Sequence, residues 1–248
     1  MLEAMSPRPT PPPAQPPSPP RSPAVIFDLD GTLVDTEPHY YEAGRRTLET
    51  YGVTGFTWEE HSQFIGIGTR ETLRTLRDRY GIDASVDELL AVKNRHYLEL
   101  AGTATDVFPG MRAFVERLHT AGHRLAVASG SSRAAIEAAL AATGLSALLP
   151  VSVSAEEVGR GKPEPDVFLA AARLLDTDPA DCVVVEDAAP GVEAARRAGM
   201  RCIAVPYAAD TGRGGPDPSA FASAGLVFPG GQGEFDADTA YAWTTGRG

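Results

Sequence analysis

Short apolar runs alternate with helical segments in the second half of the chain, and this alternation restricts the fold more than any other feature. Three of the runs, "RLAVAS", "CVVVE" and "CIAVP", lack the polar alternation of a half-exposed strand. Strands of this kind are typical of a parallel sheet that is buried on both faces. Helical segments of about ten residues separate them, as parallel crossovers require. Together with the run "AVIF" and a shorter one near "PVSVSA", they predict a doubly wound, Rossmann-like α/β sheet.

The segment between this first strand and the alternating part has helical spacing only. It contains "YYEAGRRTLETYG" and "RETLRTLRDRYG", each ending in a Gly that stops a helix, and "SVDELLAVKNRHYLELAG", which begins with acidic residues. We therefore predict that residues 36–106 form a small α-helical cap, inserted into an α/β core of residues 23–35 and 107–228.

The two ends of the chain differ from this body. Residues 1–22 read "MLEAMSPRPTPPPAQPPSPPRS", and proline at this density is incompatible with helices and strand ladders. We predict a disordered tail there. Residues 229–248 are expected to form a loosely ordered tail, from which Tyr241 and Trp243 dock on the body.

Charge and composition exclude several classes of partner. The net charge of −11 argues against binding to nucleic acid or to an anionic membrane, both of which need a basic face. No apolar run approaches the roughly 18 residues of a membrane span, and no signal peptide is evident. Cys182 and Cys202 lie in apolar runs, as reduced core cysteines do. We expect a cytoplasmic protein that is a monomer by default.

Polar residues follow the predicted strands at the points where the strands end. In a parallel sheet of this type, ligands bind beyond the carboxyl ends of the strands, so we expect these residues to share one site. They are Asp28 and Asp30 after the first strand, Ser129 and Gly130 after the second, Lys162 after the third, and Glu186 and Asp187 after the fourth.

The acidic residues of this set predict a metal site. Asp28 and Asp30 stand two positions apart and face the same way on an extended chain. Carboxylates held close repel one another and need a cation between them. Since no Cys or His accompanies them, a Mg²⁺ ion bound by Asp28, Asp30, Glu186 and Asp187 is favoured over a softer metal.

The remaining residues suit an anion bound to that metal. Lys162 is a compact cation, Ser129 can donate a hydrogen bond, and backbone N–H groups near Gly130 add further donors. This combination favours phosphoryl transfer through an aspartyl-phosphate. Asp28 would attack the phosphorus, while Asp30 would protonate the leaving oxygen and then activate water.

The sequence resembles the haloacid dehalogenase superfamily, in the branch that carries a helical cap after its first motif. The resemblance implies Asp28 as nucleophile, Asp30 as acid/base, Ser129 and Lys162 as phosphate binders, and Asp187 as the metal ligand beside Asp28. It also implies that the backbone carbonyl at Asp30 binds the metal, with Glu186 as a supporting ligand. The matching motifs, spread from Ala24 to Pro206, are "FDLDGTLVDTEP", "VASGSS", "GKPEPDVF" and "VVVEDAAPGVEAARRAG".

Within that superfamily the chain is most similar to β-phosphoglucomutase and the sugar-phosphate phosphatases around it. "GIGTRE" (66–71) resembles their substrate loop and implies a contact from Arg70, and "VKNRHY" implies contacts from Lys93 and Asn94. The mutase has a histidine twelve residues after its nucleophile, where this chain has Tyr40. His39, a further candidate near the cleft, is one position early and so rotated by about 100° on a helix. Hydrolysis is therefore favoured over mutase activity.

These residues predict a Mg²⁺-dependent phosphatase that acts on a small phosphorylated metabolite, with a sugar phosphate as the favoured substrate. Two alternatives stay open: a phosphosugar mutase, and a non-catalytic scaffold whose Pro-rich tail recruits a partner. The intact acidic residues and Lys162 speak against the scaffold. His61, His119 and His123 lie in polar surroundings, where we expect them to be exposed and to play no part in chemistry.

Overall fold

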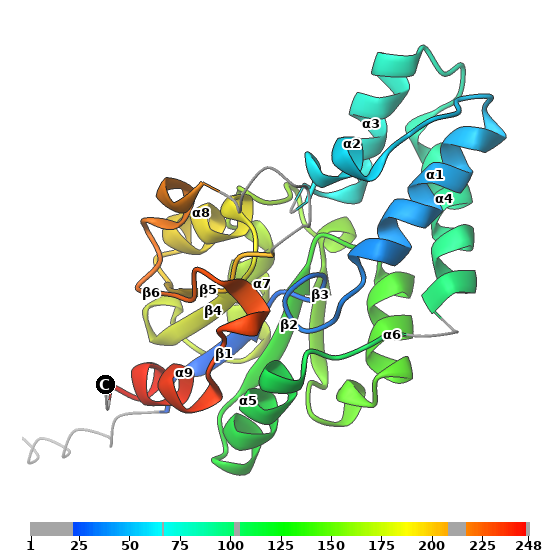
Figure 1. Ribbon diagram of the computed structural model, residues 1–248. Coiled ribbons are helices and arrows are strands. Elements are labelled where there is room, and N and C mark those ends of the chain that lie inside the picture. Colours follow the sequence, from blue (N-terminus) through cyan, green and yellow to red (C-terminus); the bar gives the residue numbers. More distant parts are fainter. Residues whose placement is uncertain (1–21, 66, 102–104, 208–216, 247–248) are drawn as a thin grey trace, which may run out of the picture.

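The computed structural model describes residues 22–65, 67–101, 105–207 and 217–246 of the 248-residue chain (Figure 1). All but Ser22 of the predicted Pro-rich tail lies outside these ranges. The described part contains a six-stranded sheet in the order β3-β2-β1-β4-β5-β6, and every pair of neighbouring strands is parallel. The doubly wound parallel sheet is thus confirmed. Its strands are β1 (Ala24–Phe27), β2 (Leu125–Ser129), β3 (Val151–Ser154), β4 (Cys182–Glu186), β5 (Arg201–Ala204) and β6 (Leu226–Val227).

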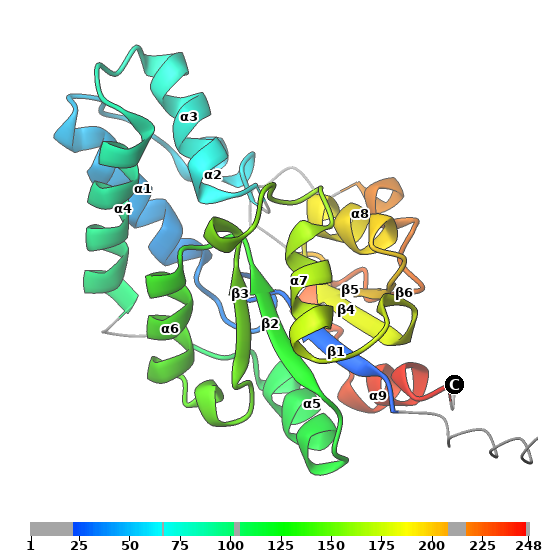
Figure 2. The same cartoon turned by 180° about the vertical axis from the view of Figure 1, so that it is seen from behind.

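Helices cover both faces of the sheet, which explains why the central strands are apolar throughout. Val25 and Phe27 point to one face, where the ring centroid of Phe27 lies 5.9 Å from that of Phe114. Ala24 and Ile26 point to the other. The first face carries α5 (Pro109–Thr120), α6 (Arg133–Ala142) and α9 (Ala237–Thr244), and the second carries α7 (Asp166–Leu174) and α8 (Ala189–Arg197) (Figures 1 and 2).

The inserted segment is helical, as its spacing predicts. The helices are α1 (Glu37–Thr50), α2 (Trp58–Ser62), α3 (Thr69–Tyr80) and α4 (Val86–Ala101), and Figure 1 shows them grouped at one end of the molecule, away from α5 and α9. Helix α3 ends at Gly81, which has a left-handed φ of +62° and permits the stop. The short α2 was not predicted. Its start carries a capping box between Thr57 and Glu60, the sequence signature that identifies it.

The C-terminal segment corrects one expectation. Instead of a loosely ordered tail, residues 237–244 form α9, and its first turn is capped by Asp236, which accepts a hydrogen bond from the Thr239 N–H at 2.8 Å. Tyr241 and Trp243 do pack on the body, beneath the guanidinium groups of Arg117 and Arg201 at 4.1 and 5.0 Å from the ring centroids. Short amphipathic pieces held by such long-range contacts have little signal in local sequence.

Two smaller features concern the whole described chain. Cys182 and Cys202 are free and buried, as expected from their apolar runs. In the ranges described, none of the helices has the length and apolar character needed to cross a membrane.

Candidate active site

A cavity of about 80 Å³ lies where the carboxyl ends of the central strands meet the inserted helices. The core contributes one wall and the inserted helices contribute the other. Lining residues from the core include Asp28, Asp30, Gly130, Ser131, Lys162, Glu186 and Asp187, and those from the inserted helices include Glu37, Tyr40, His61 and Lys93.

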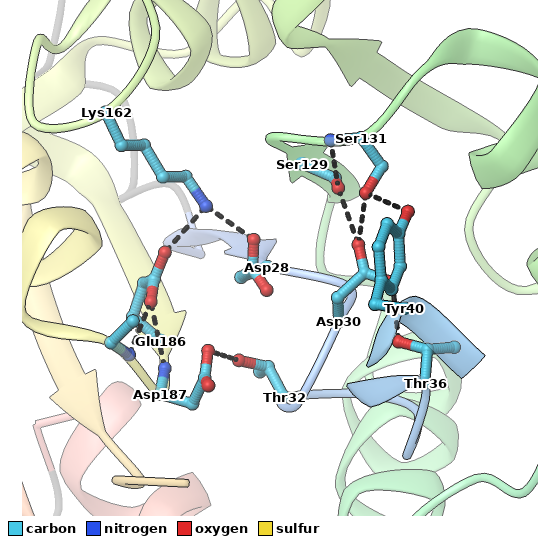
Figure 3. Close-up of polar contacts among 11 residues, drawn as sticks. Asp28, Asp30, Thr32, Thr36, Tyr40, Ser129, Ser131, Lys162, Glu186 and Asp187 are labelled. Atoms are coloured by element: carbon cyan, nitrogen blue, oxygen red, sulfur yellow. Dashed lines mark hydrogen bonds and ion pairs between the residues drawn. The ribbon is translucent and has the colours of Figure 1, made fainter. Parts of the chain in front are cut away.

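Lys162 lies between two carboxylates in the core wall (Figure 3). Its Nζ donates to Asp28 Oδ1 at 2.5 Å and to Glu186 Oε1 at 2.6 Å. All three side chains are buried, with 5%, 8% and 1% of their surface exposed. Burial opposes the charge on Lys162, but the two carboxylates outweigh it and raise the pKa of the ammonium group. Lys162 is therefore a fixed cation beside Asp28.

Asp187 provides a second acidic group with a free oxygen. Its Oδ1 accepts a hydrogen bond from Thr32 Oγ1 at 3.0 Å, while its buried Oδ2 has no partner among the described residues. Burial, followed by the charges of Glu186 and Asp28, raises its pKa well above the usual range. Burial likewise raises the pKa of Asp28, although Lys162 partly offsets this effect. One lysine does not neutralise this group of carboxylates.

This excess of negative charge fits a divalent cation. Asp28 and Asp187 are the side chains available to hold it. Among the described residues no three His, Cys, Asp or Glu side chains form a complete metal-binding group, so other ligands would be backbone, water or phosphate oxygens. Mg²⁺ suits such a site, because it usually keeps several waters and binds one or two carboxylates.

Glu186 faces Lys162 and the backbone rather than open space. Its Oε2 accepts hydrogen bonds from the N–H groups of Asp187 and Ala188, both at 2.9 Å. Gly191 makes this possible, since a Cβ at that position would lie 1.7 Å from Glu186 Oε1. In this arrangement Glu186 holds Lys162 and the turn into α8.

The side chain of Asp30 points away from Lys162 (Figure 3). Its Oδ1 accepts from Thr36 Oγ1 at 2.6 Å, and its Oδ2 accepts from Ser129 Oγ at 3.0 Å and Ser131 Oγ at 2.6 Å. Burial raises the pKa of Asp30, and these hydroxyl groups partly oppose the rise. Asp30 is thus a partly buried carboxyl group at the cavity wall, and of the predicted phosphate binders Ser129 donates its hydroxyl to it.

Of the residues that the resemblance implied in the inserted helices, Lys93 lies in the cavity wall. Its side chain is buried, with Nζ 4.4 Å from the ring centroid of Tyr40, and burial lowers its pKa to about 8. Arg70 is exposed, pairs with Asp87 at 2.6 Å and lines a neighbouring groove next to Gly130 and Lys162.

Asn94 and His39 do not line this cavity. Asn94 Oδ1 accepts a hydrogen bond from Ser132 at 3.4 Å. His39 has a buried Nδ1 without a partner in the described chain. Gly66, the first residue of the predicted substrate loop, lies outside the described residues.

Two histidines expected to be exposed are buried, and one of them lies in the site. His61 Nε2 is 2.9 Å from Glu37 Oε2, and both residues line the cavity. His123 Nδ1 is 2.8 Å from the carbonyl oxygen of Pro23. The expectation failed because neighbouring polar letters do not reveal a partner 24 or 100 residues away. His119 is exposed, as expected.

Sequence reasoning also missed Gln232, in the segment taken for a tail. Its Nε2 donates to the carbonyl oxygen of Thr32 at 2.9 Å and to that of Gly31 at 3.3 Å. Gly31 has a φ of +81°, and a side chain there would lie 2.5 Å from Asp187 Oδ2. The C-terminal segment therefore holds the turn that carries Asp28 and Asp30.

The chain is similar to known proteins over most of its length. The sequence profile described as haloacid dehalogenase-like hydrolase matches residues 25–205. A phosphoglycolate phosphatase of Cupriavidus necator is 38% identical over 195 residues, covering 78% of this chain and 84% of that protein. A phosphorylated carbohydrates phosphatase of Thermotoga maritima is 34% identical over 183 residues, covering 73% and 83%. The crystal structure of a variant of CbbY from Rhodobacter sphaeroides, in complex with xylulose-1,5-bisphosphate, matches with a TM-score of 0.74 and 27% identity, covering 87% of this chain and 100% of that chain.

Proposed function

Since this chain belongs to the family of haloacid dehalogenase-like hydrolases, we propose that it is a Mg²⁺-dependent phosphatase that hydrolyses a small sugar phosphate through a phosphorylated aspartate. That it is a phosphatase for a phosphorylated metabolite follows from its similarity to named phosphatases. The observation that carries the finer proposal is the buried Lys162 between Asp28 and Glu186, at 2.5 and 2.6 Å, beside the free oxygen of Asp187.

Asp28 is the proposed nucleophile. Its Oδ1 is held by Lys162, which leaves the other oxygen to attack the phosphorus. Lys162 and the backbone N–H groups near Gly130 would bind the phosphoryl oxygens. Ser129 would join them when its hydroxyl, which here donates to Asp30, turns to the phosphate. Asp28, Asp187 and the backbone carbonyl of Asp30 would hold Mg²⁺, which when bound neutralises charge on the phosphate. Glu186 supports this group by fixing Lys162.

Asp30 is the proposed acid and base. Its raised pKa is suited to holding a proton for the leaving oxygen. Once the alcohol has left, the same carboxylate would take a proton from the water that hydrolyses the phosphorylated Asp28. No other carboxyl group in the cavity accepts hydrogen bonds from three hydroxyl groups among the described residues.

We propose that residues 36–106, which contain the inserted helices, form a cap over the core wall and determine substrate specificity. Lys93 and the Glu37–His61 pair supply a cation and a hydrogen-bonding carboxylate opposite the core wall. Such groups suit a hydroxylated, anionic substrate. The Thermotoga relative is a phosphorylated carbohydrates phosphatase, and the similar CbbY structure holds xylulose-1,5-bisphosphate. Both support a sugar phosphate as the substrate. Arg70, Asn94 and His39, which do not line this cavity, are proposed as outer contacts.

Phosphate release from a panel of phosphorylated metabolites, with and without Mg²⁺, tests the function. We expect Mg²⁺-dependent release concentrated on one or two sugar phosphates. Asp28→Asn should abolish it, whereas Asp78→Asn, on the exposed face of α3, should not. Conversion of one hexose phosphate isomer into another, without phosphate release, would instead identify a phosphosugar mutase.

Mg²⁺ binding is measured separately by thermal unfolding. Added Mg²⁺ should raise the melting temperature of the wild-type protein by mass action. The rise should disappear in Asp187→Asn. A fully active Asp28→Asn variant would overturn the mechanism.

A further inference from the structure

A chain of hydrogen bonds runs from the cap to Asp30 (Figure 3). The hydroxyl of Tyr40, on α1, donates to Ser131 Oγ at 2.5 Å. Ser131 Oγ in turn donates to Asp30 Oδ2 at 2.6 Å. Tyr40 and Ser131 are 91 residues apart in sequence, so the chain joins the inserted helices to the loop after β2 and then to the loop after β1.

When Asp30 is ionised, the protons in this chain have one order. Burial, and then the charge on Asp30, raise the pKa of Tyr40 well above its usual value, so its hydroxyl keeps its proton. Tyr40 donates that proton to the Ser131 oxygen. A serine hydroxyl has a single proton, and with its oxygen already accepting from Tyr40, that proton is directed to Asp30. Without Tyr40, the Ser131 hydroxyl is free to rotate away.

The ring of Tyr40 is itself fixed by its neighbours. Tyr97 packs against it with ring centroids 4.5 Å apart, and Lys93 Nζ lies 4.4 Å from its centroid. Only 9% of Tyr40 is exposed. A phenol held in this way has one orientation to offer to Ser131, which is what a positioning group requires.

Tyr97 provides an internal comparison. It is more deeply buried, at 1% exposed, and packs against the ring of Tyr40. Its hydroxyl, however, makes no hydrogen bond to Ser131 or Asp30. Two adjacent tyrosines therefore share the packing, but Tyr40 alone of the two donates to Ser131.

We propose that Tyr40 is a positioning residue of this phosphatase, which acts through Ser131 to hold Asp30 in the orientation for proton transfer to the leaving group. The proposal rests on the acid/base function proposed for Asp30. In the transfer, the oxygen–phosphorus bond of the substrate breaks as Asp28 bonds to phosphorus, and the proton passes from Asp30 to the departing oxygen.

Dependence on the leaving group tests the proposal. An alkoxide needs a proton to leave, whereas p-nitrophenolate leaves without one. We would measure kcat/KM, which covers the steps up to phosphoryl transfer, with p-nitrophenyl phosphate and with the alkyl phosphate that the wild-type enzyme hydrolyses fastest. Tyr40→Phe should lower kcat/KM for the alkyl phosphate about fivefold to tenfold, as loss of one oriented hydrogen bond predicts. Its value for p-nitrophenyl phosphate should change less than about twofold.

Four further variants make the result specific. Tyr97→Phe is the matched control, since it removes a buried tyrosine hydroxyl that makes no hydrogen bond to Ser131. It should leave kcat/KM unchanged for both substrates. Ser131→Ala should resemble Tyr40→Phe, and the double variant should be no worse than Ser131→Ala alone, since both act through one link. Asp30→Asn should show the same preference for p-nitrophenyl phosphate, but larger.

The outcomes separate the inference from the proposed function. Equal losses on both substrates in Tyr40→Phe, no loss on either, or additive losses in the double variant would overturn the positioning role while Asp30→Asn still discriminates. If Asp30→Asn itself shows no discrimination between the substrates, the acid role fails and the inference falls with it. The melting temperature of each variant is measured as well, to test whether a loss of kcat/KM is caused by unfolding.

Discussion

Two buried lysines face the same cavity from opposite sides, and the protein holds them in opposite ways. Lys162, in the core wall, forms ion pairs with Asp28 and Glu186, and these carboxylates raise its pKa in spite of burial. Lys93, in the cap wall, has no carboxylate within ion-pair distance among the described residues. Burial lowers its pKa to about 8, and the more distant charges of Glu37 and Asp30 offset this only in part.

The difference shows how charge is divided across the site. The core wall is assembled before any ligand arrives, because its lysine already has anionic partners. The cap wall keeps a cation whose burial costs stability and which an anionic substrate would neutralise. Such a cost is expected at functional sites rather than in a structural core.

Removing the core lysine should have the largest effect. Lys162→Met leaves Asp28 and Glu186 buried without their cation, and breaking a buried ion pair costs about 3–5 kcal/mol. We expect the free energy of unfolding, measured by urea titration, to fall by that amount and phosphate release to be lost. Lys162→Arg, which keeps the charge, should recover part of the stability. Unchanged unfolding in Lys162→Met would contradict the ion-pair account.

Removing the cap lysine should change the free energy of unfolding in the opposite direction. The pKa of Lys93 is lowered from 10.5 to about 8, which at about 1.4 kcal/mol per unit corresponds to a cost of about 3 kcal/mol. Lys93→Met should therefore raise the free energy of unfolding by up to that amount at pH 7, while it weakens substrate binding. A less stable Lys93→Met protein at pH 7 would show that this ammonium group is already paired.

The pH dependence of that gain follows from proton binding. Between pH 8 and pH 10.5 the unfolded chain keeps the Lys93 proton and the native protein loses it. The unfolded state then binds more protons, so the contribution of Lys93 to stability rises with pH through this window. The advantage of Lys93→Met should shrink from pH 8 upward and vanish near pH 10.5. Urea titrations of both proteins at several pH values measure this.

The core wall is the part of the site that the sequence predicts well. Asp28, Lys162 and Asp187 follow strands, and the carboxyl ends of parallel strands meet at one edge of a sheet whatever the details of packing. The structure adds directions that spacing does not contain. Asp30 turns toward Thr36, Ser129 and Ser131, and Glu186 turns toward Lys162.

The cap wall is less predictable, because helix packing decides which side chains reach the cavity. Glu37, Tyr40 and Gly44 line it from α1, at the spacing of three and four residues that defines one helix face. His39 lies off that face, so the periodicity of α1 distinguishes it from Tyr40. His61 has no such local signal, since its position depends on a pairing with Glu37 across the cap.

Gln232 links the core wall to the C-terminal segment and gives a smaller effect. Gln232→Leu removes two hydrogen bonds to the carbonyl groups of Gly31 and Thr32. At the usual contribution per bond, the free energy of unfolding should fall by about 1–2 kcal/mol. Gln232→Glu should cost more, because a carboxylate cannot donate and repels these oxygens. If neither variant differs from wild type in urea titration, the C-terminal segment does not support the turn.

Arg70 should give the smallest effect, and it tests how far the cap wall extends. Its pair with Asp87 is exposed, with half of the Arg70 side chain in solvent, and exposed pairs contribute less than about 1 kcal/mol. Arg70→Gln should therefore leave unfolding almost unchanged. If Arg70 contacts the outer part of the substrate across solvent, KM should rise about twofold to threefold with kcat unaltered, as a screened charge predicts. Asp87→Asn, which frees the guanidinium, should shift KM in the other direction. A fall in kcat for Arg70→Gln would instead place this arginine at the reacting phosphate. In that case the cap would supply a cation to the reaction itself, and the contrast between a core wall that binds the phosphate and a cap wall that binds the rest of the substrate would be wrong.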